Sequence, residues 1–192
     1  NYLVEATKQG DNPFYGWGVY ADLKNSTMNA VYLGDISLGL GRDYYQKTND
    51  KNTEVIAEYT KYVASMLDQI GYKNSAAVAK EIVAFEKLTA QSLLTNEQAR
   101  DNTLQYNPKT NAELSKLVKN IDLPKYLKDA GVNTDIAIIG ELKYYQNLDK
   151  FLNTKNLGLL KDFMKYKMIS GGATVLSKNL DDIQFDFYSK YL

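Results

Sequence analysis

The 192-residue sequence contains no histidine and no cysteine. Structural and hydrolytic zinc sites are built from imidazole and thiolate ligands, whereas carboxylates alone favour calcium or magnesium. Serine–histidine triads, cysteine nucleophiles and histidine acid–base chemistry are therefore excluded for this chain, and so are disulfides. Any chemistry of its own would need paired carboxylates, a lysine or a tyrosine.

Charge and hydropathy argue against two classes of partner. The 23 basic residues balance 23 acidic ones, and a net charge of zero does not favour binding to nucleic acid or anionic lipid. No apolar run approaches the roughly 18 residues of a membrane span, and no signal peptide is visible. Asn1 is not a natural start, so we expect a segment of a longer protein. The compartment stays open, although we expect the cytoplasm rather than the extracellular space.

Residues 18–36 predict a small β-hairpin. Apolar and polar side chains alternate from Val19 to Asp22, residues 24–27 favour a turn, and Met28–Leu33 is apolar and β-branched. Hydrophobic residues make up 44% of the chain, which suits one domain with a sizeable core.

After Arg42 the apolar pattern becomes helical. Side chains recur at three-and-four spacing from Val55 to Ile70, and again from Val78 through Leu88 to Leu93. Gly71 is expected to end the first of these helices in the left-handed conformation. We therefore predict a mostly α fold, an irregular multi-helix domain with a small N-terminal β-hairpin. The predicted boundaries are 1–192 for the single domain, 18–36 for the hairpin and 43–192 for the helical bundle.

Several shorter signals mark where elements begin and end. Capping boxes are formed by Thr95 with Gln98 and by Thr110 with Glu113, and Pro124 suits the first turn of a helix that ends at Gly131. Residues 107–108, Asn-Pro, are expected to break the chain, and residues 135–139 to form a short extended segment.

Three further expectations concern individual helix ends. Asp43 is expected to cap the helix after the hairpin, with Arg42 paired nearby, and Asn52 or Thr53 to cap the next helix. Residues 171–172, Gly-Gly, are expected to kink or end a later helix.

Two short motifs suggest ligand or modification sites, and both are better explained by local structure. Gly39-Leu40-Gly41 resembles the start of a dinucleotide fingerprint, but Tyr44 replaces the third glycine and no βαβ unit surrounds it. Asn25-Ser26-Thr27 fits the glycosylation pattern, yet these residue types are expected in a tight turn anyway.

Carboxylates and tyrosines offer two more candidate features. Asp181, Asp182 and Asp186 lie along the last predicted helix, where we expect a solvated face rather than a glycosidase-like pair. The sixteen tyrosines could form a stacking surface, but most fall on apolar stripes and predict core packing. Examples are Tyr59, Tyr62, Tyr145 and Tyr166, whereas Tyr44-Tyr45 is not explained by periodicity.

Three stretches, in this order and spacing, resemble the N-terminal region of the M13 peptidases, the neprilysin and bacterial oligopeptidase O family. The first comprises Asp22-Leu23-Lys24-Asn25-Ser26, Tyr32 and Leu38-Gly39-Leu40-Gly41-Arg42-Asp43-Tyr44-Tyr45. The second comprises Phe85-Glu86, Leu88, Arg100-Asp101, Tyr106-Asn107 and Glu113-Leu114. The third comprises Leu176-Ser177 and residues 185–192. The sequence departs from the family pattern at Gly41, where a proline and one more residue are usual, and at Tyr166, where a tryptophan is expected.

The resemblance implies that no catalytic, cofactor-binding or metal-binding residue lies in this chain. In the family the zinc ligands and the general base come from a downstream HExxH helix and a later glutamate. Asn29-Ala30-Val31-Tyr32 looks like the family's substrate-binding Asn-Ala-x-Tyr element, but it precedes the turn at residues 42–45 and so lies in the wrong place. We interpret it as a coincidence.

The resemblance also implies a role for the segment. It corresponds to a helical domain that faces the catalytic domain of the same parent chain, which would carry the zinc, and together they enclose a chamber for oligopeptides. Our first hypothesis is therefore a non-catalytic lid. The alternative is a stand-alone helical module that binds a peptide or protein, and a carboxylate-based enzyme is the third reading. None of the three predicts a nucleic-acid or membrane partner.

Overall fold

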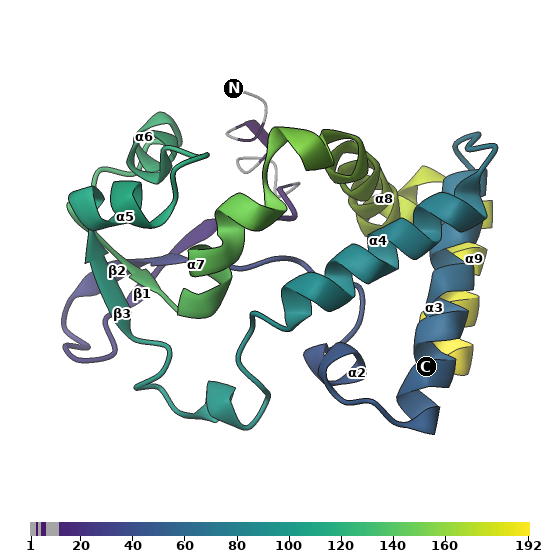
Figure 1. The fold of residues 1–192 in the computed structure, drawn as a ribbon, viewed down its shortest axis with the longest axis horizontal. Coiled ribbons are helices and arrows are strands. Elements are labelled where there is room, and N and C mark those ends of the chain that lie inside the picture. The colour runs from purple at the N-terminus through teal and green to yellow at the C-terminus, as the bar shows by residue number, and fades with distance from the viewer. Residues whose placement is uncertain (1–2, 4, 7–11) are drawn as a thin grey trace. The chain divides into compact units, whose positions relative to one another are not determined.

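The computed structural model describes residues 3, 5, 6 and 12–192. These residues form two compact units. The sheet unit contains the chain up to Ser37 together with Ser92–Thr154, and the helical unit contains Leu38–Gln91 together with Lys155–Leu192. The structure is mostly helical with one small sheet, so the predicted fold class is confirmed (Figure 1). The single domain over residues 1–192 stays a prediction.

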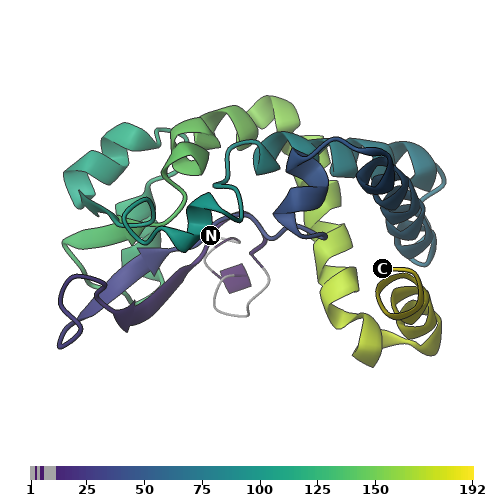
Figure 2. The same ribbon diagram turned by 90° about the horizontal axis from the view of Figure 1, so that it is seen from below.

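The sheet unit is built on four strands in the order β1-β2-β4-β3. Strands β1 (Trp17–Ala21) and β2 (Asn29–Leu33) pair antiparallel, which confirms the predicted hairpin, and its turn projects from the sheet (Figure 2). Strand β4 (Ile136–Ile139) pairs parallel with β2 and antiparallel with β3 (Asn107–Thr110).

The extended segment at residues 135–139 was predicted, but its place in a sheet was not. The expected break at Asn107-Pro108 is wrong, because these residues begin β3. Proline lacks the N–H needed for a central strand but is tolerated on an edge strand, and β3 is the outer strand of the sheet.

One face of the sheet forms the core of this unit. Val31 and Leu33 of β2 pair with Ala137 and Ile139 of β4, and all four side chains are buried. Because side chains alternate between faces, a shift of one residue in register would move this set to the other face of the sheet. Aromatic residues of the helix α7 (Leu142–Phe151) add to the core, and the Tyr145 hydroxyl donates to the Gly34 carbonyl at 2.6 Å.

The short helices of the sheet unit begin where the capping signals predict. Thr110 and Glu113 form a complete capping box at α5 (Asn111–Leu117). Thr95 and Gln98 exchange hydrogen bonds of 3.0 and 3.1 Å before the 3₁₀ helix η1 (Gln98–Arg100). Helix α6 (Leu123–Asp129) has Pro124 in its first turn, as predicted. A second 3₁₀ helix, η2, spans Thr154–Asn156.

The helical unit contains two long helices joined by a short link, α3 (Asp50–Asp68) and α4 (Ser75–Ala90). Helix α2 (Arg42–Gln46) precedes them. After α8 (Leu157–Leu176) and α9 (Lys178–Phe185), the chain ends in a π-helical segment, η3 (Asp186–Tyr191). Helix α9 lies alongside α3, with which it is in contact (Figure 1).

The predicted apolar stripe on α3 is confirmed over most of its length. Each buried aliphatic or aromatic side chain contributes about 1.5–3 kcal/mol relative to exposure. The buried members are Val55, Tyr59, Tyr62, Val63, Met66 and Leu67. Two predicted stripe positions are wrong, because Ile70 is 43% exposed and Leu88 of α4 is 59% exposed.

Two of the predicted caps are displaced along the chain. Gly41 is the N-cap of α2 without a side-chain bond, so Asp43 does not cap this helix. Asp43 is instead the second residue of the helix, and its carboxylate accepts a hydrogen bond from the Lys47 ammonium at 2.9 Å. The N-cap of α3 is Asn49, three residues before the expected cap Asn52 and four before Thr53, and its side chain accepts from the Asn52 N–H at 2.8 Å.

The expected helix end at Gly171-Gly172 is wrong, because both residues lie inside α8, whereas the expected kink stays a prediction. Phe163, Tyr166 and Ala173 of this helix are buried on both sides of the pair in the sequence. Tertiary packing of this kind routinely overrides the low helix propensity of glycine.

Gly71 has a φ of +81°, which confirms its predicted left-handed conformation. A β-branched side chain is strained there, so we expect Gly71→Val to lower the free energy of unfolding by more than about 1 kcal/mol. Gly171→Ala is the matched control, because Gly171 is helical and a Cβ there meets nothing within 4 Å. That change should raise stability by about 0.5–1 kcal/mol. Denaturant unfolding measures both, and an unchanged Gly71→Val would contradict the assignment.

Candidate functional site

The described part of the chain contains no cluster of three or more histidine, cysteine or acidic residues that could hold a metal ion. With no imidazole or thiolate in the sequence, the residues of this chain do not fit a zinc site. Among the described residues no helix is long and apolar enough to cross a membrane.

The carboxylates of the last helices lie on a solvated face, as predicted. Asp181, Asp182 and Asp186 are exposed. Asp182 pairs with Lys178 at 2.8 Å, and Asp186 pairs with Lys190. Exposed i,i+4 pairs of this kind contribute only about 0.3–0.5 kcal/mol, so these residues are surface pairs.

The most constrained polar group of the helical unit is the Glu86 carboxylate, which α4 places in the core with 0% exposure. Its Oε1 atom accepts from the Gly39 N–H at 3.0 Å and from the Tyr59 hydroxyl at 3.2 Å. Its Oε2 atom accepts from the Tyr45 hydroxyl at 2.7 Å. Three donors and no acceptor face the group, which is the environment that an ionised carboxylate requires.

A second layer of hydrogen bonds extends this network to other elements. The Tyr166 hydroxyl of α8 lies 2.9 Å from the Tyr59 hydroxyl of α3. The Tyr188 hydroxyl of η3 donates to the Gly39 carbonyl at 2.8 Å, and the Leu40 N–H donates to the Tyr45 hydroxyl at 3.1 Å. The carboxylate on α4 is thereby connected to α2, α3, α8 and η3.

Gly39 is required at its position because a neighbour lies so close. A Cβ there would come within 1.6 Å of the Tyr59 hydroxyl oxygen. The Gly39 N–H is already bonded to Glu86, so it is not available to a phosphate. Gly39-Leu40-Gly41 is therefore a packed turn before α2, as predicted, rather than a nucleotide loop.

Burial decides the electrostatics of this network. It raises the pKa of the Glu86 carboxyl above its usual value, and the Lys167 charge and the three hydrogen bonds offset only part of that effect. Burial also lowers the pKa of the Lys167 ammonium, against the opposing charge of Glu86. The pKa values of Tyr59 and Tyr166 are raised well above the usual value, first by burial and then by Glu86.

Both carboxylate oxygens of Glu86 are engaged by donors from the protein. We therefore assign the network to holding residues 38–45 in place rather than to reacting with a substrate. Sequence reasoning included Glu86 only within the family resemblance. A local signal was present, because Glu86 stands four residues after Ile82 and hence on the buried stripe of α4.

Two sequence motifs are explained by the hairpin of the sheet unit. Asn25 lies in the exposed turn, and its side-chain oxygen accepts from the Thr27 hydroxyl at 2.6 Å, which confirms the turn interpretation. Asn29-Ala30-Val31-Tyr32 forms most of β2, which is paired by β1 on one side and β4 on the other. Strand β4 pairs with Val31–Leu33, so this part of the segment has both edges occupied, and its place in the central sheet supports the interpretation of the motif as a coincidence.

Comparison with known proteins identifies the class. The family model described as peptidase family M13, for the N-terminal part of these enzymes, matches residues 1–192, and the chain therefore belongs to peptidase family M13. The sequence is 26% identical to neprilysin-11 of Caenorhabditis elegans over 93% of this chain and 23% of that protein. It is 26% identical to human endothelin-converting enzyme 1 over 92% of this chain and 24% of that protein.

A solved structure supports the fold. The zinc metalloprotease Zmp1 of Mycobacterium tuberculosis in its open state superposes with a TM-score of 0.85 at 24% identity, covering 99% of this chain and 31% of that chain. The present chain thus spans about a quarter of the length of the curated relatives it matches. The resemblance inferred from the three sequence stretches is confirmed.

Removing the Glu86 carboxylate should destabilise the helical unit. We expect Glu86→Ala to lower the free energy of unfolding by about 3 kcal/mol or more, because each buried donor left unpaired costs about 1–3 kcal/mol. Glu81→Ala on the exposed face of the same helix is the control and should change stability by less than about 0.5 kcal/mol. Equal effects in denaturant unfolding would show that Glu86 is no more than an ordinary helix residue.

Glu86 should also make stability depend on pH. Because the folded pKa is raised above the ordinary 4.5, the folded state binds the proton more tightly than the unfolded state does. The stabilisation from this proton is complete below the unfolded value and is lost as pH rises through the folded value. Compared with Glu86→Gln, which cannot titrate, the native chain should gain stability as the pH falls through the raised folded value toward 4.5. Parallel pH dependences of the two melting temperatures would contradict the raised pKa.

Proposed function

We propose that this chain is the non-catalytic helical lid of a neprilysin-like zinc metalloendopeptidase, and that it walls the chamber and limits substrates to oligopeptides. One observation carries the proposal. The M13 match extends over all 192 residues, yet the sequence contains neither histidine nor cysteine. The zinc ligands of the parent enzyme must therefore come from another part of its chain.

Helix α8 supports a role as a wall. It packs into the helical unit through Phe163, Tyr166 and Ala173. The end of the helix still exposes Val175 by 85% and Leu176 by 60%. A helix that is apolar on more than one side is typically covered on more than one side. The chemistry of this second face suits either the catalytic part of the parent or an apolar peptide in the chamber.

A lid of this kind acts by exclusion. Walls around a zinc site admit chains that fit the chamber and keep folded proteins out, and movement of the walls can limit substrate entry. The oligopeptide preference would then be a property of the cavity size rather than of any reacting group in this chain.

The test uses the full-length parent and a ladder of peptides of increasing length. We expect Val175→Asp with Leu176→Asp to change the longest peptide that is cleaved, while kcat/KM for a short peptide stays within about threefold. Thr174→Ala, at an adjacent exposed position, is the control and should leave the length limit unchanged. A length limit that does not respond to any change on this face would refute the lid.

The exposed apolar side chains also suit the alternative of a stand-alone peptide- or protein-binding module. The native reading frame beyond Leu192 separates the two. An HExxH pair with a later glutamate in the same frame is expected for a lid. A frame without them would favour the module, whose binding to peptides would then be measured directly.

A further inference from the structure

The two outer strands of the sheet, β1 and β3, differ in what they offer to a further strand. Along an antiparallel ladder every second residue of an outer strand turns its N–H and C=O away from the sheet. In β3 the Asn111 N–H donates to the Asp135 carbonyl at 3.1 Å, which places the outward groups at Pro108 and Thr110. Pro108 has no N–H, and the Thr110 N–H donates to the Glu113 carboxylate at 2.8 Å. The outer edge of β3 therefore offers no donor to a further strand.

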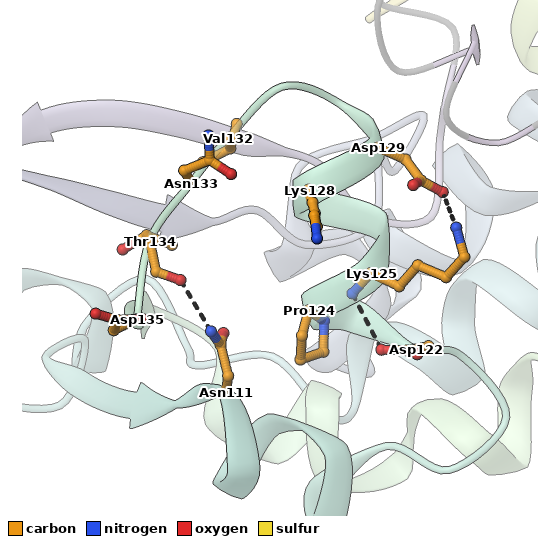
Figure 3. A pocket seen from close by; sticks show the side chains of 10 residues that line it. All are labelled: Asn111, Asp122, Pro124, Lys125, Lys128, Asp129, Val132, Asn133, Thr134 and Asp135. Carbon is orange, nitrogen blue, oxygen red and sulfur yellow. Dashed lines mark hydrogen bonds and ion pairs between the residues drawn. The ribbon is translucent and has the colours of Figure 1, made fainter.

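Strand β3 is also short, because the chain turns away from the sheet directly after it. Helix α5 begins at the next residue, Asn111, whose side-chain amide donates to the Thr134 carbonyl at 2.9 Å (Figure 3). This bond ties the start of α5 to the loop before β4. The pocket drawn in Figure 3 lies beside this junction, and no residue of β1 lines it.

Two hydrogen bonds fix which backbone groups of β1 face outward. The Gly34 N–H donates to the Gly16 carbonyl at 3.0 Å, and the Asp22 N–H donates to the Met28 carbonyl at 2.8 Å. Both bonds follow the register of the β1–β2 ladder, so the even-numbered residues of β1 bond to β2. The odd-numbered residues therefore turn their backbone groups away from the sheet.

These outward residues of β1 are Trp17, Val19 and Ala21. In the described part of the chain their N–H groups and the carbonyls of Trp17 and Val19 have no partner. The Ala21 carbonyl accepts only from the Tyr32 hydroxyl, at 3.4 Å. Strand β1 contains no proline and no charged residue, which are the residues that commonly protect an edge from pairing. Its outer edge is therefore a template for a further strand.

The apolar face of the sheet is incomplete at β1. Val19 pairs with Val31 of β2, which is buried, whereas Val19 itself is 51% exposed. Trp17 pairs with the buried Leu33, so the same face of β1 continues the core face of β2. A further strand with an apolar residue beside Val19 would extend this face.

We propose that β1 pairs antiparallel with β1 of a second copy of this chain, with Val19 opposite its own equivalent. This register alone brings all three outward residues into hydrogen-bonded pairs, because Trp17 then lies opposite Ala21 of the second copy and Ala21 opposite Trp17. The contact is symmetric about a two-fold axis at Val19, as an isologous interface requires. Each copy supplies the same row of free groups at the same spacing, so each satisfies the other.

The side chains of β1 permit this register. Since the strand is uncharged, the pairing brings no like charges together. On the other face of the sheet, Tyr20 comes opposite Gly18 of the second copy, where no side chain obstructs the ring. Position 18 has to remain glycine in any case, because a Cβ there would lie 2.5 Å from the Tyr20 ring of its own strand.

The pairing should be weak and reversible. A contact through one five-residue strand per copy belongs to the class of small interfaces, which bury less than about 1,200 Å² in total. It involves only residues of the sheet unit, so its outcome is separate from that of the lid proposal.

The experiment is sedimentation velocity of the full-length protein over a range of concentrations. We expect a reversible dimer whose dissociation constant rises at least tenfold in Val19→Lys and in Val19→Glu, because like charges then face each other at the two-fold axis. Met28→Lys is the control, since it adds the same charge to another exposed apolar residue of the hairpin outside β1. It should leave the dissociation constant unchanged.

An equimolar mixture of the two charged variants tests the register. Val19→Lys and Val19→Glu should dimerise again when mixed, since opposite charges then meet, and this recovery shows that both variants are folded. A monomeric native protein, a dimer that Val19→Lys does not weaken, or a mixture that stays monomeric would overturn the proposal. A monomeric native protein that binds an alternating valine–threonine pentapeptide would overturn it in favour of a peptide at the same edge.

Discussion

A carboxylate removed from water must be given donors, and in the helical unit that requirement falls on Glu86. Leaving such a charge unpaired in the core would cost several kcal/mol, comparable to the whole stability of a small domain. Tyr45, Tyr59 and the Gly39 N–H supply the donors. Because these groups come from different segments, satisfying one side chain fixes the positions of the turn at residues 39–41, of α2 and of α3 against α4.

The same network explains residues that have no other evident role. Gly39 is held against the Tyr59 hydroxyl so closely that no other side chain fits. Tyr188 brings η3 to the Gly39 carbonyl, so the end of the described chain is tied to the segment that enters the helical unit. Two segments that carry part of the M13 resemblance, Phe85-Glu86 and the turn at residues 38–45, meet at this point of the core.

Family membership and chemistry lead to one view of the chain. It belongs to an enzyme family, yet it spans about a quarter of the length of the curated relatives and contains neither histidine nor cysteine. Its polar core is built to hold segments in place, and its exposed apolar positions at the end of α8 call for a partner. The proposed lid role is consistent with these properties.

The sequence by itself determined the features that depend on neighbours along the chain. The hairpin, the stripe on α3, the two capping boxes and the left-handed Gly71 all follow from alternation, helical period or local hydrogen bonding. It also determined that no imidazole or thiolate ligand is available in this chain, because that depends only on which residue types are present. The predicted N-caps Asp43 and Asn52 are wrong because several residues that could cap a helix stand within one turn of each other.

Only the tertiary structure decided the features that join distant segments. Pro108 could lie in a strand because β3 is the outer strand of a sheet, and Gly171-Gly172 could stay helical because neighbouring side chains are packed in the core. The donors of Glu86 come from as far as 47 residues away in the sequence. Periodicity shows which side chains are buried, but contacts between segments show which polar groups find partners and which do not.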